Sequence, residues 1–126
     1  METKKYLKLN DVAAYKSAFH LSNFTWEIII NWKYFAQNTI GEQFVSAVDS
    51  ISANIAERFG RYGKKDKIRF YRIAKGSVME SLDWNEKAKV RKLIDKKAYG
   101  HIFSELMLLP KSINSLIKIT NQKLSV

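Results

Sequence analysis

Hydrophobic residues recur at helical spacing along almost the whole chain. Residues three or four positions apart lie on the same face of a helix, so apolar side chains at that spacing mark the face that packs against a core. Four stretches show this pattern, and one proline and five glycines leave few places where a helix would be broken. We predict four helices, which span residues 11–35, 40–60, 65–93 and 96–122.

The first two predicted helices each carry an apolar stripe. In the first, Val12, Phe19 and Trp26 lie one heptad apart and are predicted to face the core. The second helix follows Thr39 and Glu42, which have the spacing of a capping box, in which a hydroxyl and a carboxylate satisfy free backbone N–H groups. The predicted core face of the second helix consists of Phe44, Val48, Ile51, Ile55 and Phe59.

The last two predicted helices also have one apolar side when successive residues are placed 100° apart. Asp95 is the predicted N-cap of the fourth helix, because its carboxylate can accept a backbone N–H of the first turn. Pro110 lies inside that helix, where proline removes a backbone hydrogen bond, so we expect a kink or a break over residues 106–110. The predicted core residues are Phe70, Ala74, Ser77, Val78, Ser81, Trp84 and Ala88 in the third helix, and Tyr99, Ile102, Phe103, Leu106, Leu109, Ile113, Leu116 and Ile117 in the fourth.

These four helices define the expected fold class. Short connections between long helices favour antiparallel neighbours, so we predict an all-α, up-down-up-down four-helix bundle that forms a single domain over residues 1–126. The chain is 46% hydrophobic and long enough to bury a core. It contains no cysteine, no stretch with the character of a signal peptide and no apolar run long enough to span a membrane. We therefore expect a cytoplasmic protein with no membrane partner.

The second predicted helix has an unusual face opposite its apolar stripe. Between residues 44 and 56 the only charged residue is Asp49, whereas a solvated helix face normally carries several lysines and glutamates. Small side chains would allow another backbone to approach closely, so we predict a second packing surface against another subunit. The alternative is an exposed face that is rich in serine and alanine. The predicted interface residues are Ser46, Ala47, Ser50, Ala53 and Asn54.

Catalytic and metal-binding patterns are missing from the sequence. Neither His20 nor His101 belongs to the Glu-x-x-His motif that binds metal pairs in helical bundles. Several carboxylates are candidates for a general acid or base, but no pattern places a nucleophile or a water molecule beside them. We expect no cofactor, no metal and no enzymatic activity. The candidate carboxylates are Asp49, Glu57, Glu80, Asp83 and Glu86.

Positive charge is concentrated at the junction of the second and third helices. The chain has a formal net charge of +10, and residues 58–75 contain eight basic residues and one acid, Asp66. Lys65, Arg69 and Arg72 would project within roughly 60° of one another on the third helix. Because one acid cannot neutralise this charge, we predict that the junction binds the phosphates of a nucleic acid. The predicted binding residues are Arg58, Arg61, Lys64, Lys65, Lys67, Arg69, Arg72 and Lys75.

Aromatic residues are interleaved with these basic residues. Exposed rings could stack on bases, and Tyr62 in the turn is the best candidate, whereas Phe59 and Phe70 have the spacing of core residues. A second basic run, residues 87–97, lies at the other end of the third helix, roughly 30 Å away. It is either a second contact with a long ligand or a group of ordinary solvated lysines. The aromatic residues of the junction are Phe59, Tyr62, Phe70 and Tyr71.

Two other functions compete with nucleic-acid binding. The protein could be a scaffolding oligomer that binds a protein partner, with its basic surface serving solubility or an acidic partner. It could also be a hydrolase built on Glu57 and Glu80, which would show metal-dependent turnover. Charge and spacing favour nucleic-acid binding over both.

Two sequence segments resemble a known family. These are DSISANIAERFGR at residues 49–61 and KDKIRFYRIAKGSVMES at residues 65–81, and they are similar to the bacterial four-helix-bundle family of 23S rRNA intervening-sequence proteins. The family usually has glycine where this chain has Arg58. The resemblance implies a homopentamer and a preference for RNA over DNA. It extends distantly to accessory proteins of diversity-generating retroelements, which implies a reverse transcriptase as a possible protein partner.

Overall fold

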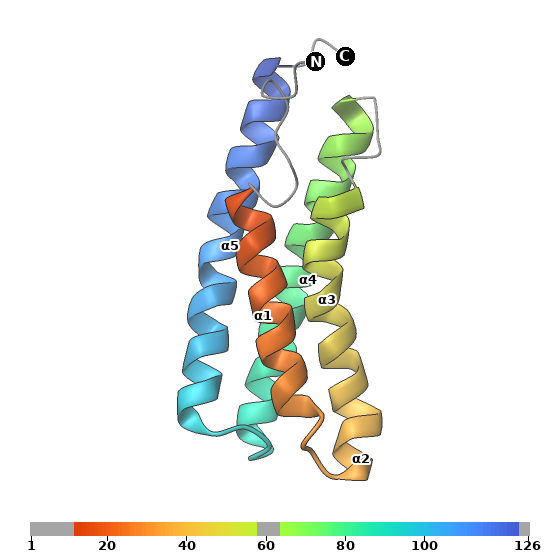
Figure 1. Ribbon diagram of the computed structural model, residues 1–126, viewed down its shortest axis with the longest axis vertical. Coiled ribbons are helices and arrows are strands. Elements are labelled where there is room, and N and C mark those ends of the chain that lie inside the picture. Colours follow the sequence, from red (N-terminus) through yellow and green to blue (C-terminus); the bar gives the residue numbers. More distant parts are fainter. Residues whose placement is uncertain (1–11, 58–63, 124–126) are drawn as a thin grey trace, which may run out of the picture.

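The computed structural model describes residues 12–57 and 64–123, which form a bundle of four long helices (Figure 1). The colours of Figure 1 show that the long helices alternate in direction along the chain, which confirms the all-α, up-down-up-down prediction. No helix of these two segments is long and apolar enough to cross a membrane. In chain order the elements are α1 (Ala13–Ile29), α2 (Tyr34–Ala36), the π-helical turn η2 (Gln37–Gly41), α3 (Glu42–Glu57), α4 (Lys64–Val90) and α5 (Lys96–Lys123).

The core contains side chains from all four long helices. The stripe predicted for the second helix is confirmed, because Phe44, Val48, Ile51 and Ile55 of α3 are each 0% exposed, while Phe59 lies outside the described residues. Most predicted core positions of α4 and α5 are buried or half-buried, but the core prediction for Phe103 is wrong, because this ring is 40% exposed. The predicted core residues of α4 and α5 that are buried are Ala74, Ser77, Val78, Ser81, Ala88, Ile102, Leu106, Leu109 and Ile113.

The first helix ends earlier than its apolar pattern predicted. Instead of continuing to residue 35, α1 ends at Ile29, and the N–H groups of Asn31 and Trp32 bond three residues back, to Ile28 and Ile29. The side-chain amide of Gln37 donates to the carbonyls of Ile29 and Ile30, which satisfies the free end of the helix. The chain can therefore turn at this point.

Two core predictions for α1 are wrong. Phe19 is 47% exposed and Trp26 is 50% exposed, whereas Val12, which belongs to the same heptad series, is buried. The core-facing residues of α1 are instead small or aliphatic, such as Ala18 and Leu21. The heptad series therefore marks a second apolar face of α1, which lies outside the bundle core.

The predicted capping box at the start of the second helix is also wrong. Residues 34–41 are already helical, so the Thr39 hydroxyl donates to the Phe35 carbonyl, at 2.7 Å, and does not cap a free N–H group. Gly41 ends the π-helical turn, where the chain passes close to the end of α1. A Cβ atom at Gly41 would lie 2.9 Å from Cγ2 of Ile29, so only glycine allows this close approach without a shift.

The fourth predicted helix begins as expected but is not interrupted. The N–H of Ala98 donates to Oδ1 of Asp95 at 2.7 Å, which confirms the predicted cap. Pro110 lies inside a continuous α5, so the predicted break is wrong, while the alternative, a kink, stays a prediction. Buried residues on both sides of it, Leu106 and Ile113, hold the two parts of the helix against the core. Tertiary packing thus offsets the cost of the missing backbone bond.

Candidate nucleic-acid interface

The N-terminal half of α4 carries a cluster of basic side chains around a surface depression of about 740 Å³. Lys65, Arg69 and Arg72 line it, as the 100° spacing predicted, together with Ile68 and Ile73. This part of α4 places Tyr71 and Ala74 in the core, which directs the basic side chains outward. We call Lys65, Arg69 and Arg72 the basic cluster.

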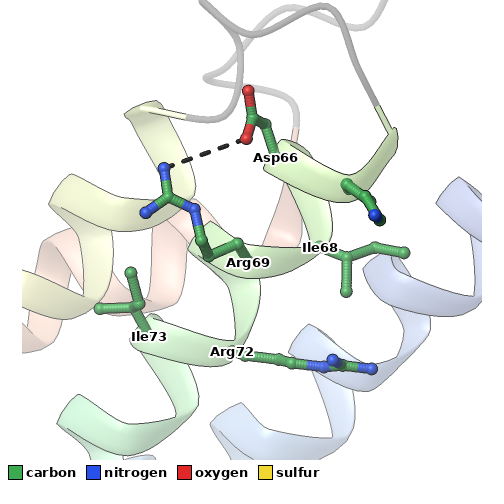
Figure 2. Close-up of a pocket in the computed structure, with 6 residues that line it drawn as sticks. Asp66, Ile68, Arg69, Arg72 and Ile73 are labelled. Atoms are coloured by element: carbon green, nitrogen blue, oxygen red, sulfur yellow. Dashed lines mark ion pairs between the residues drawn. The ribbon is translucent and has the colours of Figure 1, made fainter.

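The basic cluster has little compensating negative charge. Arg69 and Asp66 are 4.0 Å apart, and both side chains are more than half exposed, so water screens this ion pair. Figure 2 shows the Arg69 guanidinium turned back towards Asp66, while the Arg72 side chain extends in another direction. Neither Lys65 nor Arg72 forms an ion pair with another described residue. The cluster therefore keeps a net positive charge.

Two of the other predicted binding residues, Lys67 and Lys75, are described and do not belong to this cluster. Lys67 is half-buried and does not line the depression. Lys75 donates to Oδ1 of Asn114 on α5 at 2.8 Å, so its ammonium group takes part in a contact between helices. Arg58 and Arg61 lie outside the described residues, as do Phe59 and Tyr62, and the side chain of Lys64 is not described.

The aromatic residues of α4 do not form a stacking surface beside the cluster. Tyr71 is fully buried, which excludes the predicted possibility that it stacks on a base. Phe70 is half-buried, and the Arg69 guanidinium carbon lies 4.8 Å from its ring centroid, where a cation–π contact helps to orient the arginine. Sequence reasoning missed Ile68 and Ile73, although their positions among the outward-facing basic residues indicate apolar groups at the surface.

Part of the predicted subunit interface on the second helix is occupied within the chain. Ala47 is 3% exposed and belongs to the chain's own core, so its assignment to a subunit interface is wrong. The Ser50 hydroxyl accepts a hydrogen bond from Ser77 of α4 at 2.9 Å, and the Asn54 amide donates to the Ser50 carbonyl. The small side chains thus allow α3 and α4 to approach closely. Ser46 and Ala53 are exposed and remain available to another subunit.

An apolar face lies between α1 and α3. Tyr15, Phe19 and Ala53 line one depression, and Trp26 and Ile30 line another farther along α1. Asp49 lines the first depression, and its carboxylate accepts a hydrogen bond from the hydroxyl of Ser22, which lines the same depression. We call this surface the α1–α3 face.

Three of the candidate carboxylates, Glu80, Asp83 and Glu86, form contacts with neighbouring side chains of the bundle. Glu80 accepts a hydrogen bond from the Trp84 indole at 3.1 Å, and Asp83 forms an ion pair with Lys87 at 2.6 Å. Glu86 accepts a hydrogen bond from the Tyr99 hydroxyl at 2.7 Å, and this bond is the main cause that raises the pKa of Tyr99. Within the described segments, no three His, Asp or Glu side chains are close enough to hold a metal ion.

The comparisons with known proteins agree with the fold. A crystal structure of a protein of unknown function from the S23 ribosomal protein family of Bacteroides thetaiotaomicron VPI-5482 superposes with a TM-score of 0.75, over 84% of this chain and 99% of that chain. The two sequences are 21% identical, so this likeness shows the fold alone. No curated protein matches the sequence. The family profile of the 23S rRNA-intervening sequence protein matches residues 10–115. The chain therefore belongs to the 23S rRNA-intervening sequence protein family.

Proposed function

We propose that the protein is a non-enzymatic, homo-oligomeric nucleic-acid-binding protein that contacts phosphates through the basic cluster on α4. The observation that carries this proposal is the arrangement of Lys65, Arg69 and Arg72 around one depression, in which Asp66, a screened acid, is the single acid among the described lining residues. Three cations on one face repel one another in the free protein, and a polyanion would remove that repulsion. The guanidinium groups also present planar donor pairs that match phosphate oxygens.

RNA is the favoured ligand among nucleic acids. The family to which the chain belongs is described by its relation to an intervening sequence of 23S rRNA, and this description supports RNA over DNA. Phosphate contacts alone carry no sequence information, so the basic cluster would recognise the shape and charge of an RNA and not a particular sequence.

The α1–α3 face supports self-association. Phe19, Trp26 and Ile30 are each between 44% and 50% exposed, and the exposed Ala53 beside them leaves room for a close neighbour. Apolar patches of this kind mark protein–protein interfaces. The resemblance to pentameric relatives supports five subunits, and sedimentation of the purified protein would measure the number. A monomer at micromolar concentration would contradict this part of the proposal.

Charge reversal of the basic cluster tests the nucleic-acid function. We expect the double variant Arg69→Glu/Arg72→Glu to bind a structured RNA about 100-fold more weakly, because two charge-assisted contacts are lost. The dependence of log affinity on log salt should flatten by roughly 1.4 to 1.8, the value for two phosphate contacts. Fluorescence anisotropy over a salt series measures both quantities.

The matched control is Lys96→Glu/Lys97→Glu, which changes the net charge equally at exposed positions in the first turn of α5. Measured with a short blunt RNA hairpin that does not extend to residues 87–97, it should change affinity by less than about threefold at physiological salt, where charges far from the ligand are screened. Equal losses in the two double variants would show that binding follows net charge only and would reject the basic cluster as the site.

A scaffold that binds a protein partner is the second candidate function. The exposed Ile73, together with Ile68, adds apolar surface to the depression that phosphate binding alone does not require. A reverse transcriptase is the partner that the family resemblance suggests. Co-purification of such a partner that survives nuclease treatment, and that is lost in Ile73→Asp, would favour the scaffold over the nucleic-acid function.

A further inference from the structure

We propose that a second depression, at the opposite end of α4, binds the base of an unpaired nucleotide of the same ligand. The depression has a volume of about 500 Å³ and is lined by residues of α2, η2, α3 and the end of α4. This inference rests on the proposed nucleic-acid function and extends it to single-stranded RNA. We call Phe35, Gln43, Trp84, Lys87 and Arg91, which line this depression, the nucleotide platform.

The platform presents an aromatic ring to solvent. Phe35 is 79% exposed, so a large apolar surface contacts water in the free chain. A nucleobase is a flat π-system that could cover this ring, and stacking of this kind tolerates any base. An aromatic ring next to cations is the combination that single-strand-binding sites use.

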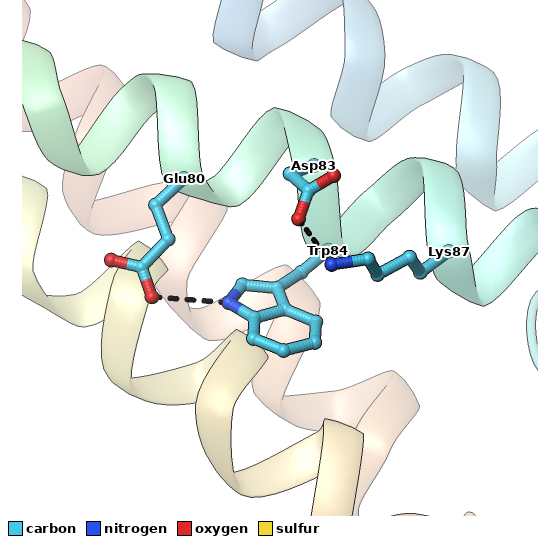
Figure 3. A network of polar contacts seen from close by, with 4 residues as sticks. All are labelled: Glu80, Asp83, Trp84 and Lys87. Atoms are coloured by element: carbon cyan, nitrogen blue, oxygen red, sulfur yellow. Dashed lines mark hydrogen bonds and ion pairs between the residues drawn. The ribbon is translucent and has the colours of Figure 1, made fainter.

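A network of polar contacts fixes the second aromatic ring of the platform. Figure 3 shows that the Trp84 indole N–H points to Glu80, to which it donates at 3.1 Å, while Lys87 lies on the other side of the tryptophan. The Lys87 ammonium group is 4.6 Å from the centroid of the indole ring and 2.6 Å from Oδ2 of Asp83. Because Trp84 is held in this way, a ligand would bind beside it without first ordering it.

Two polar side chains of the platform have no partner among the described residues. Gln43 and Arg91 are exposed, and neither side chain forms a hydrogen bond or an ion pair within the two described segments. By contrast, Asn38 and Thr39 beside them donate to the backbone carbonyls of Tyr34 and Phe35. The Gln43 amide can both donate to and accept from the edge of a base, and the Arg91 guanidinium suits a phosphate.

The charge of the platform selects a nucleic acid over other occupants. No carboxylate lines the depression among the described residues, and both charged residues that do, Lys87 and Arg91, are basic. Because Lys87 is paired with Asp83, Arg91 supplies the unpaired positive charge. The depression lined by Trp26 and Ile30, in contrast, includes the carboxylate of Glu42. Arg72 and Lys87 are fifteen residues apart on α4, which corresponds to about 22 Å, so one RNA could contact the basic cluster and the platform together.

The test compares two RNAs that differ only in an unpaired segment. One is a blunt RNA hairpin, and the other is the same hairpin with a single-stranded 3′ tail of adenosines. We expect the natural protein to bind the tailed RNA about tenfold more tightly, and Phe35→Ala to remove this preference while leaving affinity for the blunt hairpin unchanged. The matched control is Tyr34→Ala, which truncates a neighbouring ring that is 81% exposed and does not line the depression.

Arg91 is tested in the same assay. Arg91→Gln should flatten the salt dependence for the tailed RNA by about 0.7, the value for one phosphate of a single strand, whereas Lys92→Gln at the adjacent exposed position should not. Because Phe35, Arg91 and both control residues are exposed, all four variants should keep the melting temperature of the natural protein, which circular dichroism would verify.

The outcomes separate the platform from the basic cluster. If Phe35→Ala and Tyr34→Ala behave alike, or if the tail adds no affinity, the platform is rejected. The variant Arg69→Glu/Arg72→Glu then still tests the proposed function, because it changes only the basic cluster. If Phe35→Ala weakens binding and Arg69→Glu/Arg72→Glu does not, the platform stands and the basic cluster is rejected. If Phe35→Ala changes only the sedimentation of the protein, the ring contacts another copy of the chain, and the platform is overturned.

Discussion

The two halves of α4 differ in the balance of their charged residues and in the ion pairs that these residues form. Residues 64–76 contain six basic residues and one acid, whereas residues 77–90 contain two basic residues and three acids. In the second half both lysines form ion pairs one turn away, at 2.6 Å for Lys87 with Asp83 and 3.8 Å for Lys89 with Glu86. In the first half Arg69 and Asp66 are farther apart, at 4.0 Å, and neither Lys65 nor Arg72 forms an ion pair with another described residue.

This difference identifies which half of the helix is suited to bind an anion. Glutamate or aspartate one turn before a lysine stabilises a helix by about 0.3 to 0.5 kcal/mol, and the second half uses that arrangement. The first half forgoes it and instead concentrates like charges around the depression. A helix under selection for stability alone gains nothing from such a concentration, so the first half is better explained by a ligand that supplies the missing negative charge.

Among single substitutions, we expect the strongest effect when the first half of α4 is given an ion pair like those of the second half. Lys65→Glu places a carboxylate one turn before Arg69 and in the first turn of α4, where negative charge favours the helix dipole. We expect RNA affinity to fall about tenfold, because a cation is lost and another is neutralised. Unfolding in urea should show a gain in stability of about 0.3 to 0.5 kcal/mol.

Lys65→Glu should lower RNA affinity and raise stability, and these opposite changes distinguish a role in binding from a role in folding. Lys96→Glu makes the same change of charge in the first turn of α5, an exposed position that does not line the depression. With the short blunt hairpin, it should leave RNA affinity within about twofold, since a distant exposed charge is screened. An equal loss of affinity in both variants would contradict the distinction between the two halves of α4.

A smaller effect is expected when a pair is broken in the second half. Asp83→Asn removes the ion pair with Lys87, in which both side chains are about half exposed, so the free energy of unfolding should fall by only about 0.3 kcal/mol. RNA affinity should rise about twofold, because Lys87, which lines the nucleotide platform, is no longer neutralised. Lys87→Gln removes the basic partner of the same ion pair, so it should lower stability equally but should not raise RNA affinity. Urea denaturation and anisotropy measure the two effects, and a gain in both variants would exclude a charge effect.

The smallest expected effect concerns the contact between the second half of α4 and α5. The hydrogen bond to Glu86, followed by partial burial and the charge of Glu86, raises the pKa of Tyr99 above its usual value of 10.0. A raised pKa means that the folded state holds the proton more tightly, so this contribution to stability is complete below pH 10 and is lost as the pH rises through the folded pKa.

Absorbance of the tyrosinate ion during an alkaline titration tests this assignment. Glu86→Gln should move the Tyr99 transition to lower pH, and Tyr99→Phe should remove that transition from the titration. A Tyr99 pKa that does not change in Glu86→Gln would show that the hydrogen bond is not its cause.

The sequence predicted those features that local chemistry determines. The apolar stripe of α3, with Phe44 and Ile51, follows from helical periodicity, and the Asp95 cap follows from the need to satisfy free N–H groups. The grouping of Lys65, Arg69 and Arg72 follows from the same 100° rotation. Each of these predictions depends on residues close together in one helix.

Features that depend on contacts between distant segments could not be predicted in this way. Phe19 and Trp26 share a heptad series with Val12, but the series does not reveal whether a stripe faces the chain's own core or another surface. Pro110 breaks the local rule, yet burial of the residues around it keeps α5 continuous. Phe35 joins Arg91 in one depression only because α1 ends early, at a turn closed by Gln37.

The central claim is that the excess charge of α4 binds RNA phosphates. Anisotropy of nuclease-treated protein with structured RNA, duplex DNA and single-stranded DNA, each from low to physiological salt, tests it most directly. We predict tight binding of structured RNA that persists at physiological salt and has a salt dependence that decreases in Arg69→Glu/Arg72→Glu. Weak binding of all three ligands that disappears as salt is added would contradict it and would leave the charge as a general property of the surface.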